Sequence, residues 1–487
     1  MYDAIVIGND LSSIVAATLI SRSGRKTALL SEGDVKHVHS DYGYTFNIDP
    51  LPLVGFGPSQ VCSRLLDELG IRFPEGPGLK QLDPGLQVVL AEHRIDCFGR
   101  LEELLADIRR EFPGESRDIE KLYAHVLKIG DIIEEQIAAG RNTARSRLGD
   151  GLALIRRSSA ILKETFFLSR RFKSIMRNPS VARVFEAQNA VLLNLSESGN
   201  GASSIGTAYA LSLPLRGMYH HHCGNEAFME SLRASLSVSG GQVINNCSVM
   251  RLEVNKEVDV DYSTPEALST IRGRYLVTTT KWEKLRLLLA GNRKLKRMER
   301  RMKTVKTAYH PFTLHMGVLE KGLPEKMATY VAIVIDENRP VMEDNLVLLE
   351  ISTKDCEARA PAGRRALSAT VFLTESPLTL TNDDLKEVSQ VIFCALERFL
   401  PFLRENLDFL NIGMSIELSR KSQEMVNKKY AMQTRPFLGI GSLSNRTPFR
   451  NVFLTGGMLE AGLGFQGEII TGINAANSVI TKETNNG

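Results

Sequence analysis

The sequence is poor in the residues that mark several specialised classes of protein. Among its 487 residues there is one tryptophan, and no stretch of about eighteen apolar residues predicts a membrane-spanning helix. An apolar segment that starts at residue 2 leaves no room for a signal peptide. No two cysteines have Cys-x-x-Cys spacing, so we expect reduced thiols in a cytoplasmic protein. The six cysteines are Cys62, Cys97, Cys223, Cys247, Cys356 and Cys394.

The chain also lacks a large excess of charge of one sign. Its formal net charge is +4, with 43% apolar and 24% charged residues, as in ordinary soluble globular proteins. The length is sufficient for two or more domains, each with its own core. The positive charge is nevertheless unevenly distributed along the sequence.

The first 32 residues have the pattern of a βαβ unit. Tyr2–Gly8 is a short apolar run without helical period, which predicts a strand buried on both faces. Leu11–Ser23 predicts a helix, with Gly24 suited to its C-cap. Lys26–Ser31 predicts a second strand, and Glu32 follows at its end. This arrangement predicts a dinucleotide fold in which the helix N-terminus holds a pyrophosphate and the acid binds a ribose.

The turn of this unit departs from the usual Gly-x-Gly-x-x-Gly fingerprint. Only Gly8, which makes the tight turn, is present. Ser13 is small enough to replace the third glycine, which lets the helix pack close to the strand. Asp10 is the larger departure, because it places a carboxylate where two phosphate charges are expected, and Lys36 or His37 are candidates to neutralise it.

The rest of the chain alternates helices and strands without an internal repeat. Phe73–Gly78 is rich in proline and glycine and suggests a domain boundary. Residues 101 to about 190 are predicted to be helical, with breaks at Pro113 and Pro179. Other predicted elements are helices at 61–69, 225–238 and 468–481, a hairpin of 86–90 with 94–98, short strands at 242–246, 249–254, 275–279 and 451–455, and a disordered tail from Lys482.

Two segments are strongly basic. Arg156–Arg177 has seven basic residues and one acid, and its basic and apolar rows fall on opposite faces of a helix. Arg293–Lys306 has eight basic residues and one acid. A solvated surface helix and a helix in an anionic membrane interface both explain the first pattern. The apolar row is Leu154, Ile161, Leu168 and Ile175, and the basic row is Arg156, Lys163, Arg170 and Arg177.

We place the solvated surface helix ahead, and the alternative for both basic segments is a peripheral contact with the inner face of a membrane. Nucleic acid is the competing partner, but no nucleic-acid-binding motif accompanies them, and we rank it last. His220–Cys223 contains three histidines and a cysteine in a row. Adjacent side chains diverge in strands and helices alike, whereas zinc sites use spaced pairs, so we predict no metal site.

From end to end, the chain resembles the phytoene desaturase family, which includes carotenoid isomerases and retinol saturases, within the flavin amine-oxidase-like folds. The most specific match is the closing segment NVFLTGGMLEAGLGFQGEIITG, residues 451–472. The other matching segments are Leu69–Ile71, Leu82–Pro84, Arg110–Gly114 (REFPG), Gly224–Val254 and the stretch from 355 to 363 that ends in Ala360-Pro361-Ala362-Gly363.

The resemblance implies an α/β fold with non-covalently bound FAD. It implies a discontinuous Rossmann-like FAD domain (1–75, 200–290 and 430–487) and an α+β substrate domain with a helical insertion (76–199 and 291–429). It leaves the catalytic residues unknown, with Glu460, Gln466 and Arg435 as weak candidates, and leaves the oligomeric state open. The implied cofactor-binding residues are Gly8, Asp10, Ser12, Ser13, Glu32, Val249, Gly456, Gly457, Gly462, Gly464, Phe465 and Gly467.

The sequence differs from its relatives in three segments that bind FAD in the family. Asp10 and Ser13 change the fingerprint, Gly33–Val38 lacks the family's Arg-x-Gly-Gly-Arg-like turn, and His222-Cys223 stands where relatives have Gly-Gly. Two functions stay open. One is an FAD-dependent desaturase, saturase or isomerase of an isoprenoid or carotenoid-like substrate. The other is a cofactor-free isoprenoid-binding or accessory protein, in the manner of the Rab GDP-dissociation inhibitors.

Overall fold

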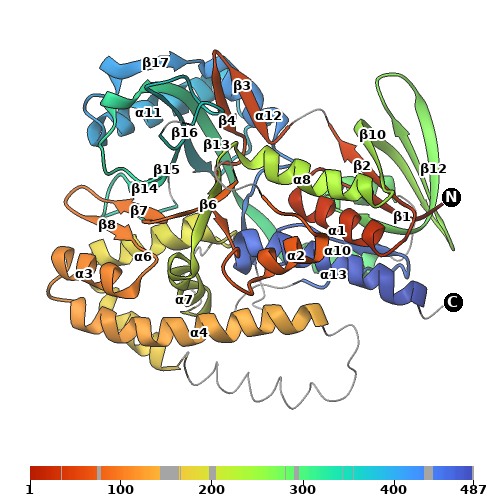
Figure 1. Cartoon of the computed structure of the whole chain (residues 1–487), viewed down its shortest axis with the longest axis horizontal. Helices are drawn as coiled ribbons and strands as arrows, with labels where there is room; N and C mark the ends of the chain where they lie inside the picture. The colour runs from red at the N-terminus through yellow and green to blue at the C-terminus, as the bar shows by residue number, and fades with distance from the viewer. Residues whose placement is uncertain are drawn as a thin grey trace.

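The computed structural model describes residues 1–33, 36–73, 78–142, 164, 166–196, 204–279, 281–289, 295–342, 344–354, 356–432 and 443–484. Two large sheets carry the fold, with helices packed around each (Figure 1). Both sheets are assembled from segments far apart in the sequence. The first sheet draws its strands from the ranges predicted for the FAD domain and the second from those of the substrate domain, although the boundaries themselves stay a prediction.

The first sheet is built on the predicted βαβ unit. The unit consists of β1 (Tyr2–Ile7), α1 (Leu11–Arg22) and β2 (Thr27–Glu32), which confirms the N-terminal prediction. The parallel strands lie in the order β10-β2-β1-β12-β19, and β11 pairs antiparallel with the outer parts of β10 and β12. The added strands are β10 (Gln242–Val254), β11 (Val258–Ser263), β12 (Leu268–Thr278) and β19 (Val452–Leu454).

Three helices cover this sheet. Helix α1 packs between α8 (Asn225–Val238) and α13 (Gly464–Thr484), and Gly472 of α13 lies so close that an added Cβ would be 2.5 Å from the Ser12 carbonyl. The bounds of α8 match the prediction. Helix α13 starts four residues before the predicted one, and one bulged strand, β10, replaces two predicted short strands. The bulge lets one strand continue past the edge of the parallel sheet.

The second sheet is mostly antiparallel and follows the order β17-β13-β16-β15-β14-β7-β8. Only β14 and β7 run parallel in it, and β18 pairs with the N-terminal part of the long strand β13. The predicted hairpin is confirmed as β7 with β8. The strands are β7 (Leu86–Val89), β8 (Arg94–Cys97), β13 (Val305–Leu319), β14 (Tyr330–Val334), β15 (Leu346–Ile351), β16 (Arg364–Leu373), β17 (Leu407–Leu410) and β18 (Lys429–Met432).

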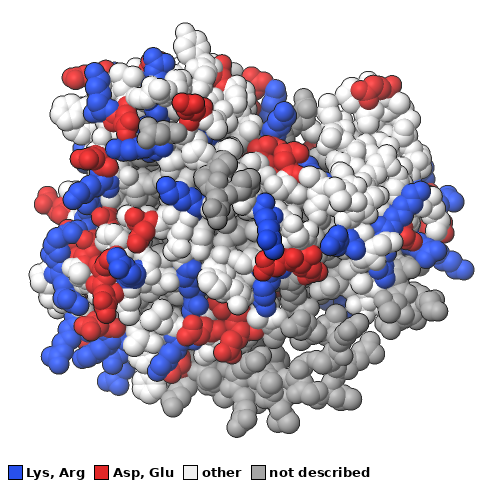
Figure 2. All heavy atoms as spheres, viewed as in Figure 1, with Lys and Arg blue, Asp and Glu red and all other residues white. Residues whose placement is uncertain are grey.

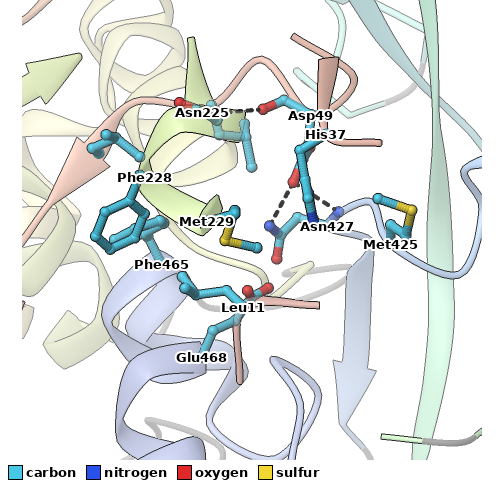
Figure 3. A pocket seen from close by; sticks show the side chains of 12 residues that line it. Leu11, His37, Asp49, Asn225, Phe228, Met229, Met425, Asn427, Phe465 and Glu468 are labelled. Carbon is cyan, nitrogen blue, oxygen red and sulfur yellow. Dashed lines mark hydrogen bonds between the residues drawn. The ribbon is translucent and has the colours of Figure 1, made fainter. Parts of the chain in front are cut away.

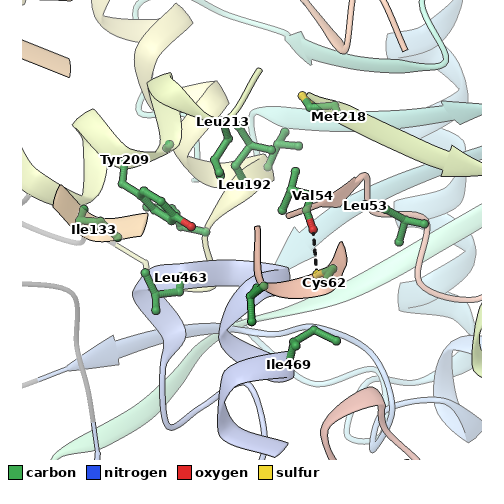
Figure 4. Packing of buried hydrophobic residues seen from close by; sticks show 14 of the residues in the cluster. Leu53, Val54, Cys62, Ile133, Leu192, Tyr209, Leu213, Met218, Leu463 and Ile469 are labelled. Atoms are coloured by element: carbon green, nitrogen blue, oxygen red, sulfur yellow. Dashed lines mark hydrogen bonds between the residues drawn. The ribbon is translucent and has the colours of Figure 1, made fainter. Parts of the chain in front are cut away.

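The predicted helical block forms a layer beside α13 (Figure 1). Its helices bury aliphatic and aromatic residues against α13 and β5 (Leu53–Val54), including Ile133, Leu192 and Tyr209 (Figure 4). The helices of this layer are α3 (Leu101–Glu111), α4 (Ser116–Asn142), α6 (Pro179–Leu192) and α7 (Ser204–Ser212). The other helices are α2 (Val61–Leu69), α9 (Trp282–Leu288), α10 (Leu295–Met302), α11 (Asn382–Phe399) and α12 (Ile412–Lys421).

Two small sheets lie between the larger elements. One pairs β3 (Val38–Asp41) with β4 (Tyr44–Asn47), and the other has the order β5-β9-β6. Strand β9 (Met218–His221) pairs with β5 and with β6 (Leu79–Leu82), so it joins segments assigned to different predicted domains. His220 and His221 are buried there as strand residues. The described residues include no group of three His, Cys, Asp or Glu side chains that is able to hold a metal ion.

A buried ion pair beside the second sheet is connected through Asn47 to the start of α8. Arg359 and Glu350 are 3% and 2% exposed, and the guanidinium donates to both carboxylate oxygens at 3.0 and 3.1 Å. Glu350 also accepts from Asn47 at 2.9 Å, and Asn47 in turn accepts from the backbone N–H of Asn225 at the start of α8. Because every charged oxygen has a donor, burial of the pair is compensated by a complete hydrogen-bond network.

The described part of the first basic segment, residues 166–177, is helical up to Ile175. Leu168 and Ile175 of the apolar row are buried, whereas Arg170 and Arg177 of the basic row are exposed, which confirms that the rows lie on opposite faces. Residues 143–163, with the other half of both rows, lie outside the described residues. Elsewhere, Figure 2 shows basic and acidic side chains interleaved over α3 and α4. Of the helices described, none has the length and apolar character needed to cross a membrane.

Candidate functional site

The candidate site is a cavity of about 880 Å³ at the carboxyl ends of β1, β12 and β19. Ligands of open α/β folds bind at such strand ends, and the volume lies in the range of small-molecule sites. The residues that follow the three strands contribute Asp10, Thr279, Thr455, Gly456, Gly457 and Met458, and α13 contributes Glu468. The segments around β13 and β18 contribute Lys303, Lys306, His310, Glu424, Lys428 and Tyr430, among others.

Asp10 caps the N-terminus of α1 with its own side chain. Its Oδ1 accepts a hydrogen bond from the backbone N–H of Ser13 at 3.3 Å, and its Oδ2 accepts from the Ser12 hydroxyl at 2.7 Å. The Ser13 hydroxyl donates to the Asp10 carbonyl at 2.8 Å. A helix N-terminus offers few free N–H groups, and they are the donors that a bound phosphate would use. The Asp10 carboxylate therefore stands in the position of the expected pyrophosphate.

Burial raises the pKa of Asp10 above the ordinary value, although the hydrogen bonds from Ser12 and Ser13 oppose the shift. Glu468 is 8% exposed, and burial together with the nearby Asp10 and Asp49 carboxylates raises its pKa as well. Asp10 and Glu468 thus make the α1 end of the cavity acidic, and burial favours the neutral form of each carboxyl group. Within the described residues, neither Lys36 nor His37 donates a hydrogen bond to Asp10, and His37 contacts the Asn9 carbonyl instead.

The His37 ring contacts the backbone of the fingerprint turn at Asn9. Its Nε2 lies 3.1 Å from the carbonyl oxygen of Asn9, and burial and the Arg233 charge lower its pKa to about 3. Arg233 of α8 donates to the Asn9 side chain at 2.9 Å and pairs with Glu226 at 2.9 Å. The sequence prediction missed Arg233, because α8 carries it more than two hundred residues from the turn. The side chains of His37 and Arg233 therefore hold the turn at Asn9, where the usual fingerprint is rich in glycine.

Glu32, the residue expected to bind the ribose, also has partners within the chain. Glu32 accepts a hydrogen bond from the backbone N–H of Val249 at 3.3 Å and forms an ion pair with Lys284 of α9. The structure therefore brings Glu32 and Val249 together, as the resemblance implies for the adenosine end. The Lys284 side chain is 44% exposed, so it is able to leave without opening a buried core.

The glycines predicted along the cofactor serve different purposes. Gly8 and Gly456 have φ of +147° and +119°, and Gly456 lines the cavity. A Cβ on Gly8 would lie 2.3 Å from Thr279 Oγ1, whereas one on Gly456 would make only ordinary contacts, at 3.9 Å with Thr279 and 4.0 Å with Asp10. Gly457 lines the same cavity, 3.1 Å from Glu468 by that measure.

Gly464 and Gly467 are required by the packing of the chain on itself. A Cβ at these positions would lie 2.0 Å from the Leu192 carbonyl oxygen and 2.3 Å from the Glu460 carbonyl oxygen, respectively. Gly462 is buried in the short 3₁₀ turn that precedes α13. The roles implied by the resemblance for these three glycines stay predictions, since close packing already accounts for Gly464 and Gly467.

Phe465 lies in a second, smaller cavity beyond Glu468 (Figure 3). Asp49 and Asn427 face it, with the Asn427 amide donating to Asp49 Oδ2 at 2.7 Å, and Phe228 and Met229 of α8 close its apolar side. Its volume is about 50 Å³. That space holds a few water molecules and no aromatic ring system.

The two described catalytic candidates, Gln466 and Glu460, make separate contacts and do not form a common site. Gln466 is buried, and its amide donates to Glu134 of α4 at 3.1 Å. The Glu460 carbonyl oxygen accepts the Leu463 N–H at 3.0 Å in the 3₁₀ turn. Arg435 lies outside the described residues.

FAD fits this site only in part. The crevice, Glu32 with Val249, and the open backbone at Gly456 suit a dinucleotide. The N-terminus of α1 does not fit a diphosphate in this conformation, because Asp10 already accepts the backbone N–H of Ser13 and its carboxylate repels phosphate. No chemical step through a flavin follows from this geometry.

Sequence comparison with known proteins finds distant relatives of this chain. No family model matches the chain. Over 445 residues the chain is 20% identical to the chloroplastic prolycopene isomerase of Arabidopsis thaliana, covering 85% of this chain and 71% of the relative. This is weak homology, and it extends over most of both proteins.

Solved structures share the architecture at lower identity. An oxidoreductase from Methanosarcina mazei superposes with a TM-score of 0.62 and 11% identity, over 96% of this chain and 98% of its own. Putrescine oxidase with bound putrescine gives a TM-score of 0.61 and 14% identity, over 98% and 99% of the two chains. The chain therefore shares the fold of these oxidoreductases, and it is weakly similar in sequence to prolycopene isomerase.

Proposed function

We propose that this chain, with the fold of the flavin amine-oxidase-like oxidoreductases and weak homology to prolycopene isomerase, is a flavin-dependent oxidoreductase of a long apolar polyene. The single observation that carries the proposal is the cavity of about 880 Å³ at the carboxyl ends of β1, β12 and β19, which Gly456, Gly457 and Met458 also line. A bound flavin supplies hydride acceptance or return. The chain's own residues supply the adenosine contacts at Glu32 and Val249 and the open backbone at Gly456.

A cofactor-free isoprenoid-binding protein is the second candidate. Two observations favour it: Asp10 satisfies the α1 N-terminus, and Lys284 pairs with Glu32, so both anchoring points of a dinucleotide are satisfied within the chain. A protein that had lost its cofactor would retain the fold if its former anchoring groups found internal partners.

The absorption spectrum separates the two candidates. Purified protein incubated with FAD and then desalted should retain the flavin absorption bands if the oxidoreductase proposal holds. The retained flavin should be released on denaturation, as expected for non-covalent binding. Protein that comes off the desalting column colourless would contradict the flavin proposal and support the cofactor-free one.

We also propose that the helix ending at Ile175 docks on anionic membranes, where an apolar polyene would be dissolved. Phe166 and Phe167 are 70% and 45% exposed, and the neighbouring Arg170 and Lys173 are exposed too. Exposed aromatic side chains beside cations suit a lipid interface, and each cation adds about 1 kcal/mol near an anionic surface.

Liposome sedimentation tests this docking. Binding should rise with the fraction of anionic lipid and fall with salt, and the pair Arg170→Glu with Lys173→Glu should reduce it at least tenfold. Lys386→Glu with Lys326→Glu, on exposed lysines elsewhere, is the matched control and should bind like the parent. Equal binding to neutral and anionic vesicles would refute the docking proposal.

A further inference from the structure

The basic side chains that line the large cavity have no role in the function proposed so far. Lys281, Lys303, Lys306 and Lys428 all line it, and His310 lies among them. Lys303 and Lys306 belong to the second basic segment, for which the sequence predicted a membrane contact. Part of that segment, at the junction of α10 with β13, lines the crevice, and the membrane contact stays a prediction.

These groups are brought together by the pairing of β13 with β18. Lys306 is paired with Ala431, and Tyr309 with Lys429, which places His310 beside the residue that precedes β18, Lys428. Lys281, just before α9, pairs with Glu424 at 2.6 Å. Three segments, around Lys281, Lys303–His310 and Lys428, thus bring basic side chains to one cavity.

Lys428 is the unusual member of the group. It is 3% exposed, and no salt bridge to it is present within the described part of the chain. Burial, with the neighbouring Lys281 ammonium, lowers its pKa to about 7, while Glu424 opposes the shift. A buried ammonium without a paired carboxylate is costly unless an anion is near.

We propose that the crevice binds a diphosphate group on Lys281, Lys306 and Lys428, in place of the N-terminus of α1 that Asp10 caps. This inference rests on the proposed function, since it names how the same crevice recognises its ligand. Ammonium groups bind phosphate as point charges, and several are needed for a group that carries two or more negative charges. The cavity has space for the rest of a nucleotide or for the start of a prenyl chain.

Isothermal titration of the full-length protein with inorganic pyrophosphate tests the inference. The parent should bind it with an affinity that falls as salt is raised. Lys428→Met should weaken binding at least tenfold and Lys306→Gln about threefold to tenfold by loss of one close charge. Lys326→Gln, an exposed lysine outside the cavity, is the matched control and should stay within twofold of the parent. Because Lys306 is exposed, its variant keeps the test usable if Lys428→Met does not fold.

Proton uptake gives a second measurement. At pH 8 the buried Lys428 is mostly neutral, and a bound diphosphate favours its charged form against the effect of Lys281. Titrations in two buffers of different ionisation enthalpy should therefore show proton uptake by the parent and less by Lys428→Met. Glu424 and His310 also face this lysine, and both remain in the variant.

Two further ligands identify the source of the diphosphate. Tighter binding of ADP than of pyrophosphate would assign the group to a nucleotide, and tighter binding of farnesyl diphosphate, with none of farnesol, would assign it to a prenyl substrate. Either result supports the inference. Absence of pyrophosphate binding, or equal binding by the parent and both lysine variants, would overturn it. Flavin retention is measured separately, so bound flavin with unaffected lysine variants would refute this inference and leave the proposed function intact.

Discussion

Asp10→Gly is expected to bind FAD more tightly than the parent, by about tenfold to a hundredfold. The substitution removes the carboxylate that accepts the Ser13 N–H and lines the cavity beside Gly456. It frees the helix donors for a phosphate and lowers the repulsion that any phosphate in the crevice meets. Flavin fluorescence quenching measures the dissociation constant, and a constant that is unchanged or larger would contradict the role assigned to Asp10.

Ser13→Gly is the matched control in the same turn. Serine is already small, so the change should move the dissociation constant far less than Asp10→Gly does. Replacement of an N-cap aspartate by glycine costs only roughly a few tenths of a kcal/mol in stability. Lower stability therefore does not mask the gain in affinity.

The affinity of the parent for FAD should also rise as the pH falls below neutrality. Burial raises the pKa of Asp10, so this carboxyl becomes neutral at a higher pH than an ordinary aspartate. Its repulsion of phosphate then disappears while the phosphates remain charged. Glu468 and Asp49 face the same region, and burial raises the pKa of both. Asp10→Gly should consequently show a shallower pH dependence than the parent, although not a flat one.

Arg359→Met should lower the free energy of unfolding by about 3–5 kcal/mol, because it leaves the Glu350 carboxylate buried without its partner. The pair is almost completely buried and doubly hydrogen-bonded, and Glu350 also holds Asn47. Urea unfolding followed by circular dichroism measures the change. The double variant Arg359→Met with Glu350→Leu removes both charges and should recover most of the loss.

Arg364→Met is the control for this experiment. Arg364 lies 3.3 Å from Asp408, but the two side chains are 40% and 23% exposed. An exposed pair of this kind contributes about 0–1 kcal/mol. A loss at Arg359 no larger than the loss at Arg364 would show that burial of the pair has no energetic consequence.

Local patterns in the sequence predicted the elements whose residues are neighbours in the chain. The apolar runs of β1 and β2, the helix between them and α8 follow from periodicity and glycine positions, and the structure confirms them. The amphipathic helix α2 also ends as predicted, at Gly70 in the left-handed region. Such features depend on φ preferences and on burial of one face, which a short segment determines by itself.

No short segment of the sequence indicated which residues would line the crevice. Asp10 was identified from its place in a known fingerprint, but its neighbours Glu468 and Lys428 are separated from it by more than four hundred residues. Lys303 and Lys306 appeared as part of a surface charge run, because charge alone does not show which way a strand will face. The pairing of β13 with β18 fixes the position of Lys306 at the cavity, and Lys303 lies in the turn before β13.

The position of β19 has a consequence for how the protein is made. Residues 452–454 pair with β12 and complete the parallel sheet, and α13 then packs against α1 from the opposite end of the sequence. During synthesis, therefore, α1 lacks α13 until the 441 residues between them have been translated, and the edge of β12 lacks β19 for 173 residues. The second sheet is complete once β18 has been made, so its folding can precede closure of the crevice. Among the described elements, those from β19 to α13, which close the crevice, are thus translated after all the others.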